Sequence, residues 1–344
     1  MTSKERRHTV HQRTSSGSQI REANLAQATL HYTEELPVQP SSRWGVILAG
    51  GDGTRLLSLT RSLTGDDTPK QFCALGGRET LLDRTRRRVS SVVPSRNTLL
   101  LLTRTHERFY ARQLSGLAAT NLLVQPYNHG TAVAVAYAVT HLHSISPEAI
   151  VGFFPSDHHF ECEEAFALAV NNAFLHAERD ANHVVLIGII PESAEESYGW
   201  IERAGPLPAS GTSPVFGVRR FWEKPSKDKA RRLMAEGCLW NSFVMVGRVS
   251  AFIRMLRRSL PEMLLSFESM WALVEQTTET AALYELFSKV SPSSFSDDVL
   301  SICPSDLAVM PLQDAGWTDL GDPERAQATF RLPQTNIAGS ATRR

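Results

Sequence analysis

The stretch Val46 to Arg55, VILAGGDGTR, is the starting point for predicting both fold and function. Its apolar first half predicts a buried strand, and the strand runs into a loop with three glycines, Gly50, Gly51 and Gly53. Glycine lets backbone N–H groups turn toward a polyphosphate without a Cβ atom in the way. The motif therefore predicts a phosphate-binding loop directly after a strand.

Two basic residues accompany this loop. Arg55 closes the motif, and Lys70 follows in the sequence TPKQF. An arginine and a lysine can neutralise phosphate oxygens that backbone groups alone cannot. The loop has neither the G-x-x-x-x-G-K-[ST] spacing of a P-loop nor the third glycine of a dinucleotide-binding fingerprint. Taken alone, the motif could instead form a tight turn with a surface arginine and bind no phosphate.

The composition is that of a globular protein without an excess of charge. The 344 residues are 42% hydrophobic and carry 36 basic and 36 acidic side chains. This balance provides no basic field for nucleic acid or an anionic membrane. Four scattered cysteines without C-x-x-C spacing favour reduced thiols over disulfides or a zinc site. Because the sequence shows no apolar signal core and no long apolar run, we expect a cytoplasmic protein.

From Trp44 onward, apolar runs alternate with amphipathic segments, which predicts an α/β domain with a largely parallel sheet. Strands are expected at 44–48, 99–102, 122–124, 149–154, 184–190, 198–201, 215–221, up to 246 and at 308–311. Helices are expected at 81–89, 106–114, 131–141, 166–177, 227–235 and 323–330. Helical spacing also dominates about 250–290, which we interpret as a helical subdomain or lid.

The remaining segments are polar. Residues 1–43 have few large apolar groups, so we expect a disordered N-terminal tail before a domain at 44–331. A second tail is expected at 332–344. The Gly-, Pro- and Ser-rich segment 204–214 predicts a surface loop between two strands.

The sequence motifs follow one another in a characteristic order: GGDGTRL, TPKQF, QPYNHGTA, FPSDH, YGWIE, RRFWEKP, LWNS and GWTDLG. Together they resemble the sugar-1-phosphate nucleotidyltransferases, most closely the mannose-1-phosphate guanylyltransferases, from about Trp44 to Phe330. The resemblance implies a Rossmann-like nucleotide-diphospho-sugar transferase fold with a mainly parallel mixed sheet. It also implies Mg²⁺ dependence and transfer of a nucleotidyl group from an NTP, which the guanylyltransferase resemblance implies is GTP, to a sugar-1-phosphate such as mannose-1-phosphate.

The resemblance assigns roles to individual residues. Arg55 and Lys70 would grip the triphosphate, and Lys224 would pair with the sugar phosphate. Asp157 and Asp319 would hold Mg²⁺, with Asp157 also counted among the catalytic residues. The nucleotide-binding residues would be Gly50, Gly51, Gly53, Thr54, Gln125, Gly130 and Thr131. The sugar-binding residues would be Gly199, Glu223 and Asn241.

This chemistry demands little covalent help from a protein. In-line attack on an α-phosphorus needs positioning and charge neutralisation. A phosphate monoester has its second pKa at about 6, so the sugar phosphate supplies its own oxyanion at neutral pH. Carboxylates suit Mg²⁺, a hard cation, although Asp157 and Asp319 lie so far apart in the sequence that only the fold can bring them together.

Some residues depart from the family pattern. Phe243 stands where the guanylyltransferases usually have a glycine, Gly321-Asp322-Pro323 replaces a glycine-serine-aromatic run, and the base loop reads NHGTA. Base and sugar specificity are therefore left open, as is assembly into a homo-oligomer. A catalytically silent regulatory homologue is a competing hypothesis, although the phosphate-gripping and metal-binding residues are retained. A glycosyltransferase of similar fold would need a D-x-D motif, which Pro155 to His158 lacks.

Several residues also have structural interpretations. Asp319 could cap the last helix, Asn241 could satisfy a turn, and Asp157 could cap a loop. The adjacent histidines His158 and His159 would point to opposite faces of an extended segment, which disfavours joint metal binding. The arginines between Arg84 and Arg88 are expected on a solvated helix face.

Overall fold

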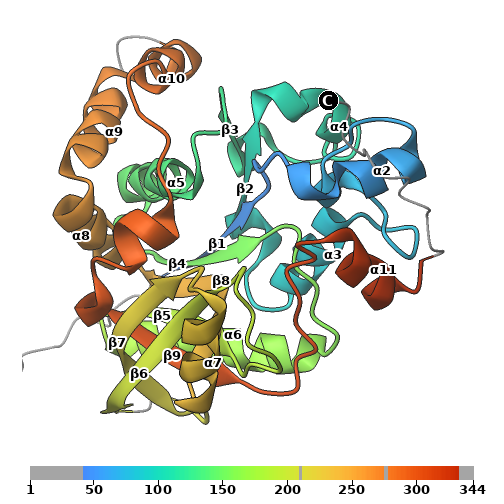
Figure 1. Ribbon diagram of the computed structural model, residues 1–344. Helices are drawn as coiled ribbons and strands as arrows, with labels where there is room; N and C mark the ends of the chain where they lie inside the picture. Colours follow the sequence, from blue (N-terminus) through green and yellow to red (C-terminus); the bar gives the residue numbers. More distant parts are fainter. Residues whose placement is uncertain (1–41, 209–210, 275–277, 333–344) are drawn as a thin grey trace, which may run out of the picture. The chain divides into compact units, whose positions relative to one another are not determined.

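The computed structural model describes residues 42–208, 211–274 and 278–332 of the chain. Nearly all of the predicted N-terminal tail, and all of the C-terminal tail after residue 332, fall outside these residues. A nine-stranded mixed sheet lies at the centre, in the order β3-β2-β1-β4-β8-β5-β9-β7-β6 (Figure 1). Its strands are β1 (Arg43–Leu48), β2 (Thr98–Thr103), β3 (Leu122–Gln125), β4 (Ile150–Pro155), β5 (Val184–Ile189), β6 (Gly199–Leu207), β7 (Val215–Glu223), β8 (Leu239–Arg248) and β9 (Leu307–Leu312).

Half of the sheet is parallel and consists of β3, β2, β1 and β4. Leu48 at the end of β1 is paired with Pro155 at the end of β4. The glycine loop and the segment after Pro155 therefore leave the sheet side by side. This arrangement is expected for buried parallel strands, whose carboxyl ends meet at one edge.

The other half is mixed. β8 runs antiparallel to both β4 and β5, while β9 is parallel to β5. β6 and β7 form an antiparallel pair at the far edge, and β6 also contacts β8 through Trp200 and Trp240. In this part of the sheet β6 begins at Gly199, β7 ends at Glu223, and Asn241 lies near the start of β8.

Helices cover both faces of the sheet. One face carries α5 (Thr131–Ile145), α8 (Val249–Ser259), α9 (Pro261–Val274) and α10 (Glu279–Phe287), which Figure 1 shows gathered on one side. The predicted helical region at 250–290 is therefore observed, and its side chains share a buried cluster with α5. The other face carries α3 (Leu81–Ser90), α6 (Glu163–Arg179) and α7 (Lys227–Ala235).

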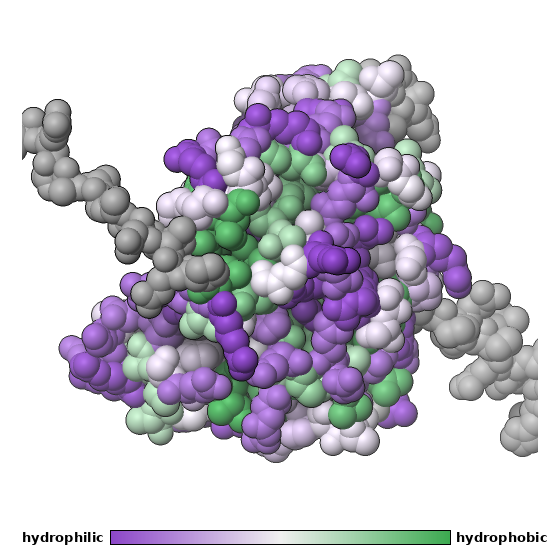
Figure 2. Space-filling model, turned by 90° about the vertical axis from the view of Figure 1, so that its right-hand side faces the viewer, coloured by the Kyte–Doolittle hydropathy of each residue, from purple (hydrophilic) through white to green (hydrophobic). Residues whose placement is uncertain are grey.

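A third, small cluster joins α2 (Leu57–Thr64), α3 and α11 (Pro323–Phe330) through Leu59, Leu81 and Ala326. It brings the segment that contains Asp319 next to the segment that follows the glycine loop. Figure 2 looks onto the side of the molecule that carries α2 and α11, where hydrophilic side chains surround separate apolar areas.

Two local predictions were wrong. The helix expected at 106–114 is a single turn, α4 (Glu107–Tyr110), after a short 3-10 turn at Arg104–His106. Tyr110 and Leu114 are buried as the helical spacing required, but turns replace the helix after Tyr110. The loop expected at 204–214 begins later, because β6 continues to Leu207 opposite Val215. Pro206 within β6 has no N–H to donate, and the pairing is irregular there.

None of the described helices is long and apolar enough to cross a membrane.

Candidate functional site

A cavity of about 390 Å³ opens where the glycine loop, the end of β4 and the mixed half of the sheet meet. This volume lies in the range of small-molecule sites. Most residues that the sequence assigned to the site line this cavity: Gly50, Gly51, Arg55, Gln125, Gly130, Thr131, Asp157, Gly199, Glu223, Lys224, Asn241 and Asp319. Gly53, Thr54 and Lys70 do not line it.

The glycine loop is fixed from the protein side through its carbonyl groups. Gln71 Nε2 donates to the carbonyl oxygens of Ala49 (3.1 Å) and Gly51 (2.7 Å). Thr103 Oγ1 donates to the carbonyl of Gly50 at 2.8 Å. Gly53 has a φ of 61°, a left-handed conformation that favours glycine, and begins the turn that leads to Arg55. Arg55 itself is exposed and borders the cavity.

Asp52 connects the glycine loop to a second loop, residues 126–130 between β3 and α5. Its carboxylate accepts a hydrogen bond from Asn128 Nδ2 at 2.8 Å and lies 3.2 Å from His106 Nε2. Burial lowers the pKa of His106, although Asp52 opposes this effect. The Asn128 Oδ1 atom accepts from the Gly130 N–H at 3.1 Å. The acid inside the glycine loop is thus directed toward these partners, and it does not line the cavity.

The second loop requires glycine at position 130. Gly130 has a φ of 88°, and a Cβ atom there would overlap the carbonyl oxygen of Ser293. The adjacent Thr131 begins α5 and accepts from the Phe295 N–H at 2.8 Å. Gln125 is only 1% exposed and donates from Nε2 to Thr103 Oγ1 at 3.0 Å. Its Oε1 atom is buried and has no hydrogen-bond partner among the described residues.

The fold brings the two predicted metal ligands together through a backbone bridge. His159 and Thr318 exchange two N–H···O hydrogen bonds of 2.9 and 3.0 Å. Asp157 and Asp319 therefore lie on adjacent, antiparallel segments. The two carboxylates can hold one ion only if the fold brings these distant parts of the chain together. The sequence alone could not show this contact.

Lys70 contacts the same two segments, although it does not line the cavity. Its ammonium lies 3.2 Å from Asp157 Oδ2 and donates to the carbonyl oxygens of Asp319 (2.7 Å) and Leu320 (3.3 Å). Burial raises the pKa of Asp157, but the nearby Lys70 and His158 outweigh it and hold the pKa below its ordinary value. Asp157 is therefore ionised at neutral pH. Lys70 is buried, and in this geometry it supports the acidic pair from behind the cavity wall.

The hydrogen bonds to the Asp319 carboxylate converge on Oδ1. This atom accepts from Gly321 N–H (2.8 Å), Tyr198 Oη (3.1 Å) and Arg325 Nη1 (3.2 Å). Arg325 also pairs with Glu195 at 2.9 Å. The alternative that Asp319 caps the last helix is wrong, because Asp322 Oδ1 caps α11 by accepting from the Arg325 N–H at 2.8 Å.

The described residues contain no cluster of three or more His, Cys, Asp or Glu side chains arranged to hold a metal. Two carboxylates at a cavity wall are nevertheless the donor set expected for Mg²⁺ when substrate phosphates and waters complete its shell. The residues present therefore fit the predicted ion.

The opposite end of the cavity contains the predicted sugar-binding residues. A Cβ atom on Gly199 would lie 2.7 Å from Phe221 Cζ and 2.9 Å from Glu223 Oε2, so glycine is needed for space. Burial raises the pKa of Glu223, while Lys224, with its Nζ 3.1 Å from Glu223 Oε1, opposes the shift. Asn241 lines the cavity and also accepts from the Phe243 N–H at 3.0 Å, so its interpretation as a turn residue is partly confirmed.

Phe243 has a φ of 58°, the left-handed conformation in which a glycine is usually favoured. Its ring lines the cavity and meets Phe295 edge to face at 6.3 Å. Lys224 also has a positive φ, of 41°. Non-glycine residues in such conformations are costly and cluster at functional sites.

Sequence reasoning did not assign several residues that line the cavity: Gln71, Asn128, Ser156, His158, Ser197, Tyr198, Ser296 and Trp317. Gln71 follows Lys70 directly, and Tyr198 and Trp317 belong to the sequence motifs given above. Their positions within these motifs could have identified them as site residues. His158 lines the cavity and packs against Trp317, whereas His159 packs against Phe330. The two rings thus have different surroundings.

The prediction of a solvated arginine face was wrong for Arg88. This residue is only 4% exposed, and its guanidinium packs over the rings of Phe160 (5.0 Å) and Phe166 (5.5 Å). Burial lowers the pKa of Arg88 to about 10, although Glu163 opposes the shift. Thr85, one turn earlier on α3, donates to the Ser156 carbonyl at 3.2 Å. The inner face of α3 thus supports the segment that contains Asp157.

Comparison with known proteins places this site in a family. The sequence matches the Nucleotidyl transferase family over residues 44–330. It is 32% identical over 282 residues to the mannose-1-phosphate guanylyltransferase ManC of Salmonella typhimurium, covering 80% of this chain and 57% of the relative. It is 31% identical over 286 residues to the mannose-1-phosphate guanylyltransferase of Escherichia coli, covering 82% and 58%. The chain thus spans somewhat more than half the length of these relatives.

Solved structures support the same conclusion. A Thermus thermophilus protein described as mannose-1-phosphate geranyltransferase superposes with a TM-score of 0.69 at 27% identity, covering 81% of this chain and 76% of the other. A UDP-glucose pyrophosphorylase complexed with UDP-glucose, at 12% identity and a TM-score of 0.53, shares the fold alone, covering 85% and 97%. The predicted fold class and the predicted resemblance are both confirmed. The prediction of a mainly parallel sheet was wrong, because four strand pairings are parallel and five are antiparallel. The chain belongs to the sugar-1-phosphate nucleotidyltransferase family.

Proposed function

We propose that the cavity transfers a nucleotidyl group from an NTP to a sugar-1-phosphate, with Mg²⁺, and that GTP and mannose-1-phosphate are the substrates. The main supporting observation is the acidic pair Asp157 and Asp319, which Lys70 contacts. The pair lies between the glycine loop and the end of the cavity that Glu223 and Lys224 line. This arrangement places charge-stabilising groups between a phosphate-binding region and a region suited to a sugar phosphate.

The reaction balances without a general base. A phosphate oxygen of the sugar-1-phosphate attacks the α-phosphorus, a new P–O bond forms, and the bond from the α-phosphorus to the β-phosphate oxygen breaks. Pyrophosphate leaves with the electron pair of that bond. Mg²⁺ would neutralise the phosphate oxygens as charge shifts between them. Asp157 and Asp319 would hold the ion, and Arg55 would meet phosphate oxygens at the cavity rim.

The remaining groups would select and position the substrates. Glu223 and Asn241 would accept or donate hydrogen bonds at sugar hydroxyls, and Lys224 would meet the sugar phosphate. Gln125 and Gly130, which line the cavity beside the glycine loop, would contact the base. The guanine and mannose assignments are supported by the names of the relatives at 31–32% identity. We further propose that the protein acts in the cytoplasm.

A substrate matrix tests the proposal. Purified protein with Mg²⁺ is incubated with each of GTP, ATP, UTP, CTP and dTTP against mannose-1-phosphate, glucose-1-phosphate and N-acetylglucosamine-1-phosphate, and pyrophosphate release is measured. We expect the highest kcat/KM with GTP and mannose-1-phosphate. No release from any pair would contradict an enzymatic function and favour a silent homologue. Release with UTP or dTTP only would contradict the guanylyl assignment.

A further inference from the structure

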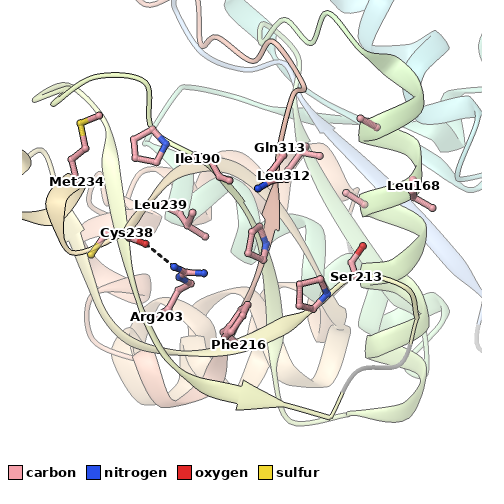
Figure 3. A pocket seen from close by; sticks show the side chains of 16 residues that line it. Leu168, Ile190, Arg203, Ser213, Phe216, Met234, Cys238, Leu239, Leu312 and Gln313 are labelled. Carbon is pink, nitrogen blue, oxygen red and sulfur yellow. Dashed lines mark hydrogen bonds between the residues drawn. The ribbon is translucent and has the colours of Figure 1, made fainter.

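A second and larger cavity, of about 670 Å³, lies between α6 and the strands β6, β7 and β8 (Figure 3). It shares no lining residue with the cavity described above. Its walls are mostly apolar, with Phe216, Leu239 and Leu312 among them. Leu168 and Ile190, which also line it, are 57% and 39% exposed. The volume again matches small-molecule sites, which are mostly apolar with a few polar groups.

Arg203 is the only charged residue among those that line this cavity. Its Nη2 atom donates to the carbonyl of Gly237 at 3.1 Å, and its guanidinium lies 5.1 Å from the centre of the Phe216 ring. Among the described residues, no carboxylate forms an ion pair with it. Figure 3 shows the guanidinium among the lining side chains, near Leu239 and Phe216.

A cation without a counter-ion on apolar walls favours a particular class of ligand. Guanidinium groups bind carboxylates, sulfonates and phosphates through paired N–H donors. The surrounding leucine, isoleucine and phenylalanine side chains would bury apolar area of the same ligand. A fully polar molecule would leave this surface without apolar contact, and a second anionic group would have no charged partner among the described lining residues.

We propose that this cavity is a second binding site, which takes a small molecule with an apolar body and one anionic group. Such a ligand lies on strands that also reach the predicted sugar subsite. Gly199 and Arg203 lie on β6, Phe216 and Glu223 lie on β7, and Leu239 and Asn241 lie on β8. The ligand therefore contacts the same strands as the sugar subsite without entering it.

Two dyes with the same aromatic body separate the contributions of charge and apolar contact. 8-Anilinonaphthalene-1-sulfonate contains one anionic group, and N-phenyl-1-naphthylamine has the same rings without it. Each dye is titrated into the folded, full-length protein, and fluorescence gives its Kd. We expect Arg203→Met to weaken binding of the sulfonate at least about tenfold, because a charge-assisted hydrogen bond contributes that much or more. Arg203→Lys keeps the charge but loses the paired N–H donors, so its affinity for the sulfonate should lie between those of the wild type and Arg203→Met.

The controls locate the site. Arg219→Met removes an exposed arginine from β7 outside the cavity and should leave both affinities unchanged. Ala165→Trp, which fills the cavity from α6, should weaken both dyes, with circular dichroism confirming that each variant is folded. The proposal is overturned if the sulfonate does not bind, if Arg203→Met leaves its Kd unchanged, or if GTP with Mg²⁺ displaces it. None of these outcomes depends on nucleotidyl transfer.

Discussion

Lys70 illustrates how one side chain can support a site that it does not line. Its ammonium contacts Asp157 and the backbone of Asp319 and Leu320, so it neutralises one acid and fixes the other. A lysine after a glycine loop was predicted to grip phosphates directly. That role stays a prediction. The contacts of Lys70 with Asp157, Asp319 and Leu320 could not be predicted from the sequence, because they depend on the assembled fold.

The first prediction concerns the acidic pair. Asp157→Asn and Asp319→Asn should each lower kcat at least ~100-fold, the loss seen when a single charge-stabilising donor is removed. Chelation of Mg²⁺ with EDTA should abolish activity in the wild type. Asp228→Asn, on the exposed surface of α7, is the matched control and should retain normal turnover. Turnover near that of the wild type in either site variant would remove that residue from the mechanism.

Glu223 gives a prediction about pH. Burial raises its pKa in the folded protein, so the folded state binds a proton more readily than the unfolded state. The cost of burying the ionised carboxylate is therefore present at pH 7 and disappears as pH falls below the unfolded pKa. Glu223→Gln should raise the Tm at pH 7, and the difference should shrink as the pH approaches 4. A Tm difference that grows with falling pH would contradict the raised pKa.

Phe243 leads to a prediction about specificity. Its left-handed backbone conformation costs about 1–2 kcal/mol for a residue with a Cβ atom, which Phe243→Gly would recover while losing contact with Phe295. The variant also enlarges the cavity near the predicted sugar residues. The ratio of kcat/KM for N-acetylglucosamine-1-phosphate to that for mannose-1-phosphate should rise about tenfold or more. An unchanged ratio would show that Phe243 does not limit the sugar.

Among the secondary-structure elements, α3 shows how a helix that does not line the cavity supports the acidic pair. Its inner face contacts the segment after β4 through Thr85 and Arg88. Arg88→Ala should lower the free energy of unfolding by about 2–4 kcal/mol, because it removes buried packing as well as charge. Arg87→Ala, one residue away and exposed, should cost about 0.5 kcal/mol or less. Urea denaturation of the two variants measures the difference, and equal losses would contradict the buried role of Arg88.

Most strands could be predicted from sequence because a buried strand is a short apolar run. The pattern is less decisive where one turn of helix suffices to bury two side chains, as at Tyr110 and Leu114. It also failed where β6 continues through Pro206. The strand order could not be predicted, since the insertion of β8 between β4 and β5 depends on contacts between distant segments.

At the scale of the whole molecule, the site exists because several distant segments converge. The pairing of Leu48 with Pro155 places the glycine loop beside Asp157, and the bridge between His159 and Thr318 adds Asp319. The ordered motifs allowed most lining residues to be predicted without these contacts. The partners that position them, such as Arg325 on Asp319 and Asp52 on Asn128, could not be predicted because they depend on the assembled fold.

The proposed reaction requires that a sugar phosphate oxygen attacks the α-phosphorus of the nucleotide in this cavity. It is tested most directly by incubating the protein with Mg²⁺, GTP and mannose-1-phosphate that contains ¹⁸O in every phosphate oxygen, and analysing the products by mass spectrometry. We expect GDP-mannose that retains all of the label, together with unlabelled pyrophosphate. Absence of a nucleotide sugar, or ¹⁸O in the pyrophosphate, would contradict it.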